Sequence, residues 1–212
     1  MERALVVLGD VVGSREVADR EALQRDLQGS MQAVNQRHED DVLASFSLLK
    51  GVDEFGGVLT GITALYDIVK TIYRSTSPTA VRFAGAYGRV DVGSERREVA
   101  EMNGPAFHRA DGLLSDIDVD GRLFALYTGD DLLDIFIGNY VNLCLMQMSE
   151  WTPRETEIVD AYERMGTQSV AAEELDVSQQ RVSNVIRETN WKEFRRMESD
   201  LNNALAIYDE SL

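Results

Sequence analysis

The order of strand-like and helix-like apolar patterns in the first 150 residues is the feature that most limits the fold. Strand patterns cover 4–8, 42–49, 58–59, 80–92 and 123–127, and helix-spaced patterns cover 17–37, 60–74, 105–114 and 130–148. The first six of these elements follow the order β-α-β-β-α-β, which is that of the ferredoxin-like unit. We therefore expect an α+β fold with a ferredoxin-like sheet, and a turn between its second and third strands at 51–55.

The distribution of charge and of helix signals divides the chain into two parts. The 212 residues include 37 acidic and 21 basic side chains, which gives a net charge of −16. Against this background, 177–196 contains five basic residues and only two acidic ones. A new helix-start signal at 151–153 follows an apolar helical run. We therefore expect a sheet domain over 1–150 and an all-α helix-turn-helix domain over 151–212.

The composition excludes several classes of protein. With one cysteine and two histidines, the chain has neither an internal disulfide nor a metal cluster of thiols or histidines. Its apolar runs are far shorter than the roughly 18 residues of a membrane span, and it starts without a signal-peptide pattern. We expect a cytoplasmic protein with no membrane partner. The acid excess, with 18 Arg against 3 Lys, favours a halophilic source, and the alternative is an ordinary acidic protein.

Acidic side chains stand at two places that the expected sheet brings together. Asp10 ends the first strand pattern, and Asp53 and Glu54 lie in the turn before the third strand. Because the first and third strands are central neighbours in a ferredoxin-like sheet, these carboxylates should converge. Such an oxygen-rich site suits Mg²⁺ or Mn²⁺, which would hold and polarise a triphosphate. The alternative is that Asp10 caps the following helix and that Asp53 and Glu54 are ordinary turn residues.

Five stretches of the sequence together resemble the SatD family. They are Gly-Asp-Val-Val-Gly-Ser-Arg at 9–15, Asp-Arg at 19–20, Asp-Glu-Phe at 53–55, Val-Arg-Phe-Ala-Gly-Ala-Tyr-Gly at 81–88 and Asn-Gly-Pro-Ala-Phe-His-Arg-Ala at 103–110. The family looks like a relative of the palm-type nucleotidyl cyclases, and the resemblance covers about residues 3–127.

The resemblance implies a palm-like domain in which Asp10 and Asp53, with Glu54 beside them, hold metal ions. The cations near the motifs that could meet a nucleotide are Arg15, Arg20 and Arg109. Val52 stands where the cyclase pattern has a glycine that lets the backbone approach the nucleotide. The resemblance therefore implies metal or nucleotide binding rather than turnover, and we assign no catalytic residue.

A second motif, in 168–187, follows the spacing of a helix-turn-helix. Ala172 is small where two helices should cross closely, and Asp176 stands at the turn position that often needs a positive φ. Ser178 is a candidate N-cap for the second helix. Upstream, Thr152 and Glu155 have the spacing of a capping box. The pattern resembles sigma-factor region 4 and related DNA-binding domains.

The second helix of this motif would enter the major groove of DNA. The residues that would contact DNA from it are Gln179, Gln180, Arg181, Ser183, Asn184 and Arg187. Glutamine and asparagine suit adenine and arginine suits guanine, while the basic stretch would supply phosphate contacts. The alternative is a helix-turn-helix that serves only packing or protein contacts.

Apolar residues recur at three- and four-residue intervals from Trp191 to Tyr208, which predicts a last helix with one apolar stripe. The stripe either packs on the first domain or pairs with a second chain, and we expect a homodimer. The sequence thus favours a DNA-binding regulator whose first domain binds a divalent metal and a nucleotide. The alternatives are a metal-dependent nucleotidyl cyclase or transferase, and an interaction module that neither catalyses nor binds DNA.

Overall fold

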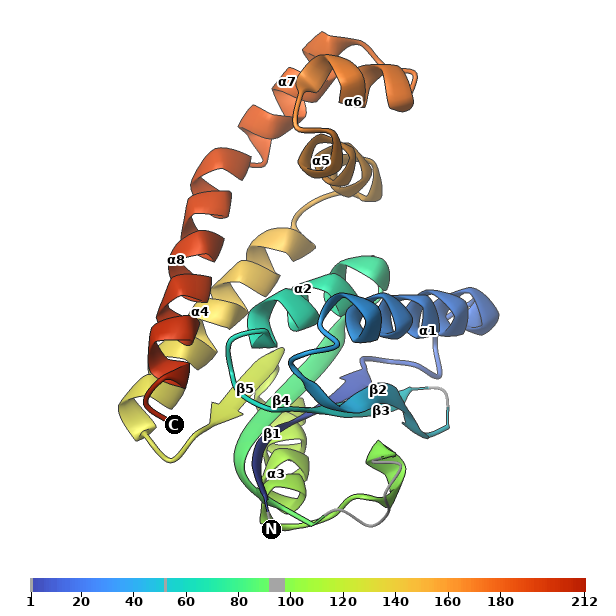
Figure 1. Cartoon of the computed structure of the whole chain (residues 1–212). Coiled ribbons are helices and arrows are strands. Elements are labelled where there is room, and N and C mark those ends of the chain that lie inside the picture. Colours follow the sequence, from blue (N-terminus) through green and yellow to red (C-terminus); the bar gives the residue numbers. More distant parts are fainter. Residues whose placement is uncertain (1, 52, 92–97) are drawn as a thin grey trace.

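The computed structural model describes residues 2–51, 53–91 and 98–212, and shows a five-stranded sheet covered by helices (Figure 1). The strands are β1 (Glu2–Val11), β2 (Val42–Lys50), β3 (Glu54–Leu59), β4 (Val81–Val90) and β5 (Phe124–Tyr127). Their order across the sheet is β2-β3-β1-β4-β5, antiparallel from β2 to β4 and parallel between β4 and β5. The mixed α+β class and the contact between the first and third strands are confirmed.

The described residues form eight α-helices in two groups along the chain. The first group is α1 (Arg20–Arg37), α2 (Leu65–Ser75), α3 (Pro105–Asp120) and α4 (Asp131–Ser149), with a short 3-10 helix, η1 (Val99–Glu101), before α3. The second group is α5 (Pro153–Met165), α6 (Gln168–Glu174), α7 (Gln179–Glu188) and α8 (Trp191–Asp209). None of these helices could span a membrane, because each is too short or too polar.

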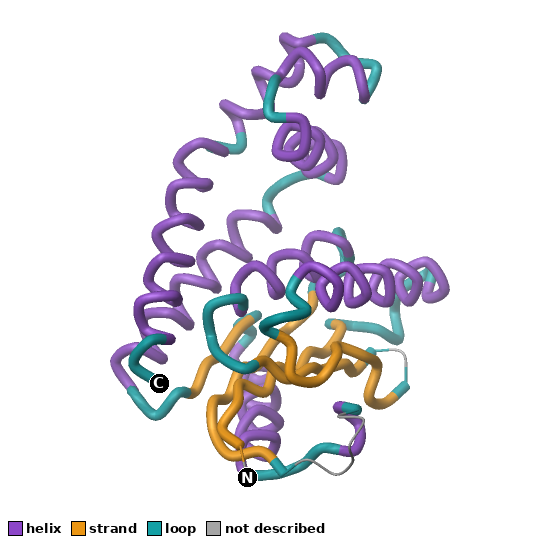
Figure 2. Tube along the Cα trace, in the orientation of Figure 1, coloured by secondary structure: helices purple, strands orange, loops and turns teal. Residues whose placement is uncertain are grey.

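β1 is buried on both sides, and its alternate residues enter two separate apolar cores. Leu5 and Val7 belong to the larger core, which α1, α2 and α4 cover. Ala4 and Val6 face the other side of the sheet, where α3 packs through Ala106. Figure 2 shows helices on both sides of the strands. Burial on both faces explains why the sequence of β1 is a continuous apolar run rather than an alternating one.

Helix boundaries differ from the sequence prediction where local contacts decide them. α1 begins at Arg20 rather than at 17, because the Asp19 carboxylate accepts a hydrogen bond from the Ala22 backbone N–H at 2.8 Å and caps the helix. α3 continues to Asp120 rather than ending at 114, and Gly121 ends it with a φ of 77°. The longer α3 shapes a pocket described below, which Ser115 and Asp118 of its additional turns line.

The second group of helices begins as the sequence predicts, with a capping box between Thr152 and Glu155 at the start of α5. α5, α6 and α7 pack on one another, and α8 then runs back beside α4 (Figure 1). Phe194, Leu201 and Leu205 of α8 are buried in the same core as the sheet. The alternative in which the last helix packs on the first domain is therefore confirmed. The domain boundary at 150 stays a prediction, since this core includes residues on both sides of it.

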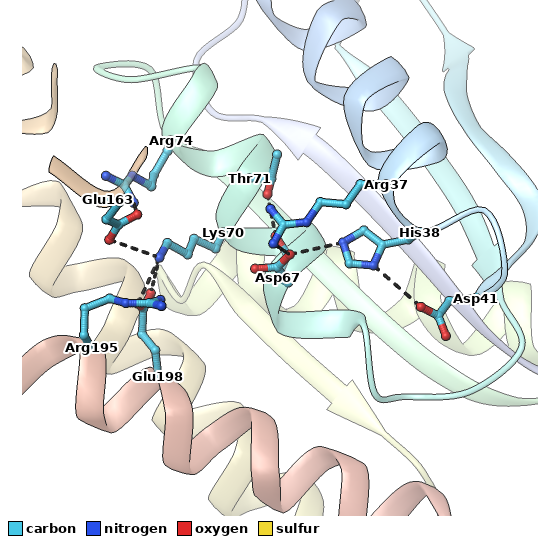
Figure 3. A network of polar contacts seen from close by, with 10 residues as sticks. All are labelled: Arg37, His38, Asp41, Asp67, Lys70, Thr71, Arg74, Glu163, Arg195 and Glu198. Atoms are coloured by element: carbon cyan, nitrogen blue, oxygen red, sulfur yellow. Dashed lines mark hydrogen bonds and ion pairs between the residues drawn. The ribbon is translucent and has the colours of Figure 1, made fainter. Parts of the chain in front are cut away.

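A buried carboxylate fixes α8 to α2. Glu198 is 1% exposed and accepts hydrogen bonds from the Tyr66 hydroxyl at 2.7 Å and the Lys70 ammonium at 2.9 Å. Arg195, one turn earlier on α8, donates to the same carboxylate at 2.9 Å. Glu163 of α5 lies 3.7 Å from the Lys70 Nζ, so the network joins α2, α5 and α8 (Figure 3). Burial and the neighbouring Glu198 raise the pKa of Tyr66, which therefore remains a neutral donor.

The C-terminal end of α8 is tied to the sheet half as well. The Asp209 carboxylate accepts hydrogen bonds from the Ile62 backbone N–H at 2.8 Å and from the Thr63 hydroxyl at 2.7 Å. Gly61 leaves room for this carboxylate, because a Cβ at that position would collide with it. α8 is thus held at its middle and at its end, and these contacts set the position of the helices that precede it.

We expect Glu198→Ala to lower the free energy of unfolding by about 3 kcal/mol, because it leaves the Lys70 ammonium buried without its carboxylate. Urea denaturation followed by circular dichroism measures the change. Glu210→Ala, at an exposed glutamate beside the end of the same helix, is the control and should change the free energy by less than about 0.5 kcal/mol. An equal effect of the two substitutions would show that Glu198 does not anchor the helix.

Candidate functional site

A pocket of about 520 Å³ opens between the ends of β1 and β3 and one face of α3. Its polar lining residues are Asp10, Glu54, Asn103, His108, Asp111, Ser115 and Asp118. Its apolar lining residues include Leu8, Leu49, Phe55, Met102, Phe107 and Leu114. The volume and the mixed lining are those of a small-molecule site.

The strand register places the predicted carboxylates at this end of the sheet. Asp10 of β1 pairs with Glu54 of β3, and the Val11 backbone N–H donates to the Asp53 carbonyl at 3.1 Å. These three residues therefore lie at one end of the sheet, as expected, but only Asp10 and Glu54 line the pocket. Asp10 lies inside β1, and Asp19 caps the helix that follows, so the alternative in which Asp10 caps that helix is wrong.

Asp10 has a positively charged partner. Arg82 of β4 donates from Nη2 to the Asp10 carboxylate at 2.9 Å, and it also pairs with Asp118 of α3. Burial raises the pKa of Asp10 above its usual value; Arg82 opposes this shift, and Asp53 and Glu54 add to it. A carboxylate whose charge is destabilised by its surroundings in a pocket is typical of functional sites.

The described residues, as arranged, do not fit the expected Mg²⁺ or Mn²⁺ site. Asp53 accepts a hydrogen bond from the Ser14 hydroxyl at 2.6 Å and does not line the pocket. Asp10 is paired with Arg82. Within 2–51, 53–91 and 98–212, no group of three or more His, Cys, Asp or Glu side chains could hold an ion. Metal binding by Asp10, Asp53 and Glu54 therefore stays a prediction.

The three arginines expected to meet a nucleotide do not line the pocket. Arg15 precedes α1, Arg20 is the first residue of that helix, and both are exposed. The Arg109 guanidinium lies over the Tyr127 ring, 4.2 Å from its centroid. Their role in nucleotide binding stays a prediction. Val52, whose departure from the cyclase pattern argues against turnover, lies outside the described residues.

The α3 side of the pocket was not predicted from the sequence. His108, Asp111, Ser115 and Asp118 recur at three- and four-residue intervals, which places them on one face of the helix. This spacing is a usable signal. However, a helix predicted to end at 114 leaves the last two of these residues outside it, so the face is not recognised. Arg82 was missed as well, because its partners come from β1 and α3.

The turn between α6 and α7 has the local geometry that the sequence predicts. Asp176 has a φ of 50°, so the positive φ expected at this position is confirmed. Ala172 of α6 and Val182 of α7 are buried in the same core. The Ser178 hydroxyl accepts a hydrogen bond from the Arg181 backbone N–H at 3.1 Å and caps α7, as expected. Local sequence therefore sets both the turn and the start of α7.

One face of α7 is polar and open to solvent. Its exposed residues are Gln179, Gln180, Arg181 and Arg187, with Ser183 and Asn184 partly covered. The Asn184 side-chain oxygen accepts hydrogen bonds from Gln180 at 3.0 Å and from Arg187 at 3.1 Å, so these three side chains form a row. The structure thus presents all six residues that the sequence assigns to DNA contact on one short helix.

A second cavity, of about 660 Å³, lies between α2, α5 and α8. Five cations line it: Arg37, Lys70, Arg74, Arg164 and Arg195. Each of them forms an ion pair with a carboxylate of the same or a neighbouring helix, namely Asp67, Glu163, Glu174 or Glu198. Figure 3 shows these pairs except that of Arg164 with Glu174. Because these cations already have partners, we interpret this region as a set of ion pairs that holds the helices together and not as a second candidate site.

The raised pKa of Asp10 predicts how stability depends on pH. The folded protein holds the Asp10 proton more tightly than the unfolded chain does, so ionisation of Asp10 weakens the fold as pH rises. Asp10→Asn should therefore raise the urea midpoint at pH 7, and the gain should disappear as pH falls toward the ordinary carboxyl pKa. Asp116→Asn, at an exposed acid of α3 outside the pocket, is the control. A lower midpoint for Asp10→Asn at pH 7 would mean that its pair with Arg82 outweighs burial.

Comparison with known proteins bears on the identity of the chain. The SatD family profile matches residues 4–203, which is most of the chain. A search of curated proteins gave no match. Among solved structures, the chain is similar to one described as a bacterial light-regulated adenylyl cyclase, with 11% identity, a TM-score of 0.37 and coverage of 59% of this chain and 75% of that chain. The chain belongs to the SatD family.

Proposed function

We propose that this protein is a DNA-binding regulator in which α5, α6 and α7 form a helix-turn-helix and α7 enters the major groove. The observation that carries the proposal is the open polar face of α7, which follows the left-handed residue Asp176. The row of Gln180, Asn184 and Arg187 offers the hydrogen-bond donors and acceptors that base edges require.

The charge near α7 supports the same function. The chain as a whole carries a net charge of −16, so most of its surface would repel DNA. Arg181 and Arg187 on α7, and Lys192 and Arg196 on the first turns of α8, are exposed cations that lie close together in the chain. Positive side chains beside a helix in the groove are those that phosphate contacts need. This part of the acidic protein is therefore the best suited to DNA.

We expect the wild-type protein to select a sequence from a random pool of DNA duplexes, and to bind it with an affinity that falls as salt rises. Arg181→Ala combined with Arg187→Ala should weaken binding to the selected duplex about 100-fold, since each good base contact contributes about 1–3 kcal/mol. Fluorescence anisotropy at several salt concentrations measures the affinity.

The control for this experiment is Arg25→Ala combined with Arg89→Ala, which removes the same charge from exposed positions on α1 and β4. Binding that survives in the control and is lost in the α7 variant assigns the contact to α7. Equal losses of affinity in the two variants, or a wild type that selects no sequence at any salt concentration, would contradict the proposal. Either result would favour a helix-turn-helix that serves packing or protein contacts.

We infer a second function, the binding of a small molecule in the pocket against α3. Four carboxylates line it, those of Asp10, Glu54, Asp111 and Asp118, and Arg82 is paired with two of them. A ligand that donates hydrogen bonds or carries positive charge, and that also has an apolar part, fits this lining. A triphosphate would be repelled by these carboxylates unless a divalent cation accompanied it. The nucleotide and cyclase alternatives therefore depend on Mg²⁺ or Mn²⁺.

Thermal unfolding with spermidine, arginine, Mn²⁺, or ATP or GTP together with Mn²⁺ tests this inference. A ligand at about 100 times its Kd should raise the unfolding temperature by roughly 5 °C. Asp111→Asn should abolish the rise, whereas Asp116→Asn, outside the pocket on the same helix, should retain it. A rise only with the nucleotides would support the nucleotidyl cyclase or transferase, for which pyrophosphate release is the assay. A rise that survives Asp111→Asn, or none with any probe, would contradict binding in this pocket.

A further inference from the structure

One face of α4 exposes large apolar side chains to solvent. Leu132, Ile135, Phe136, Leu143 and Met146 are each between 56% and 67% exposed. The opposite face of the helix is also apolar, and its buried residues in the main core are Ile137, Val141, Cys144, Leu145 and Met148. A helix that is apolar all round is normally buried on all sides. The exposed face of α4 is therefore a surface without its partner.

The exposed residues follow the spacing of a seam between two helices. Positions 132, 136, 139, 143 and 146 are separated alternately by four and three residues, which is the heptad spacing of helices that pack on each other. Asn139 is exposed and stands at the middle of this row. We call this row, Leu132, Phe136, Asn139, Leu143 and Met146, the α4 stripe.

The charge of α4 points to a second copy of the chain as the partner. From 135 to 149 the helix has no Asp, Glu, Lys or Arg, although the chain carries a net charge of −16. Two copies of so acidic a protein repel each other over most of their surfaces, so a charge-free surface is where they can meet. An anionic membrane fits less well, because Asp131 and Glu150 stand at the two ends of the helix.

The area of the surface is sufficient for a dimer. α4 packs on β5, α2 and α8, and these contacts leave the stripe free. A groove of about 220 Å³ lies beside it, lined by Leu126, Ile135 and Asn139 and also by the charged residues Arg122 and Asp134. With roughly 100 Å² exposed on each of five apolar residues, the four of the stripe and Ile135, two copies would bury at most about 1,000 Å² in total, which is the threshold for a specific interface.

We propose that the α4 stripe is the surface through which two copies of this chain form a symmetric dimer. Because Asn139 lies at the midpoint of the stripe, it meets its own copy whether the two helices run parallel or antiparallel. A polar residue at one position of an apolar seam fixes the register of the two helices. The dimer does not depend on the proposed DNA binding, but it supplies two copies of α7, as a two-fold symmetric DNA site requires.

Sedimentation velocity of the full chain without DNA tests the proposal. The wild type should be a dimer at micromolar concentration, and Phe136→Asp and Leu143→Asp, measured separately, should each raise the dimer Kd at least about 100-fold. Val119→Asp, at an apolar residue that is exposed on α3, is the matched control and should remain dimeric. Circular dichroism establishes that each variant is folded.

A cysteine crosslink tests the geometry and does not depend on the aspartate variants. Asn139→Cys should form a disulfide between subunits under mild oxidation, whereas Leu132→Cys should do so only if the two helices are parallel. The wild-type chain has one cysteine, Cys144, which is buried. Oxidation of the wild type therefore measures how much disulfide forms without the introduced cysteine. A monomeric wild type, a dimer that persists in both folded aspartate variants, or a dimer that Asn139→Cys fails to crosslink would overturn the proposal.

Discussion

The buried carboxylate of Glu198 is the contact on which the arrangement of the two halves of the chain depends. Its donors Tyr66 and Lys70 are 132 and 128 residues earlier in the sequence. A buried carboxylate is tolerated only where hydrogen-bond donors and an opposite charge replace the lost water. A placement of α8 that separates Glu198 from these partners would therefore destabilise the folded chain. α8 is fixed on α2 as a result. Only Thr189 and Asn190 separate α7 from α8, so the position of α8 also limits that of α7.

The two candidate sites lie in different parts of the molecule. Figure 1 shows α7 near the start of α8, and α3 on the far side of the sheet. The sites share no residue, so contact with DNA would leave the pocket open to a ligand. α8 connects the two regions physically, because it follows α7 in the chain and its end contacts Ile62 and Thr63 in the sheet half. Ile62 and Thr63 do not line the pocket, so this connection joins α8 to the sheet half and not to the pocket itself.

The sequence predicts those features that neighbouring residues decide, and misses those that distant residues decide. The positive φ of Asp176 follows from its place in a tight turn, and the meeting of Asp10 and Glu54 follows from strand order. The last turns of α3 were missed because 115–120 contains three aspartates, whereas in the structure the helix continues with Ile117 buried. The burial of Glu198 could not be predicted, since a glutamate is normally exposed and its partners lie on another helix.

Hydrogen exchange of the full chain, with and without the DNA duplex that it selects, tests the central claim most directly. A helix that enters the major groove has its solvent-facing side covered, so the account predicts slower exchange across α7 and the start of α8 when DNA is bound. Exchange in α1 and α3 should stay the same. Protection confined to other elements, or no change in α7 at saturating DNA, would contradict the assignment of α7 as the helix that contacts DNA.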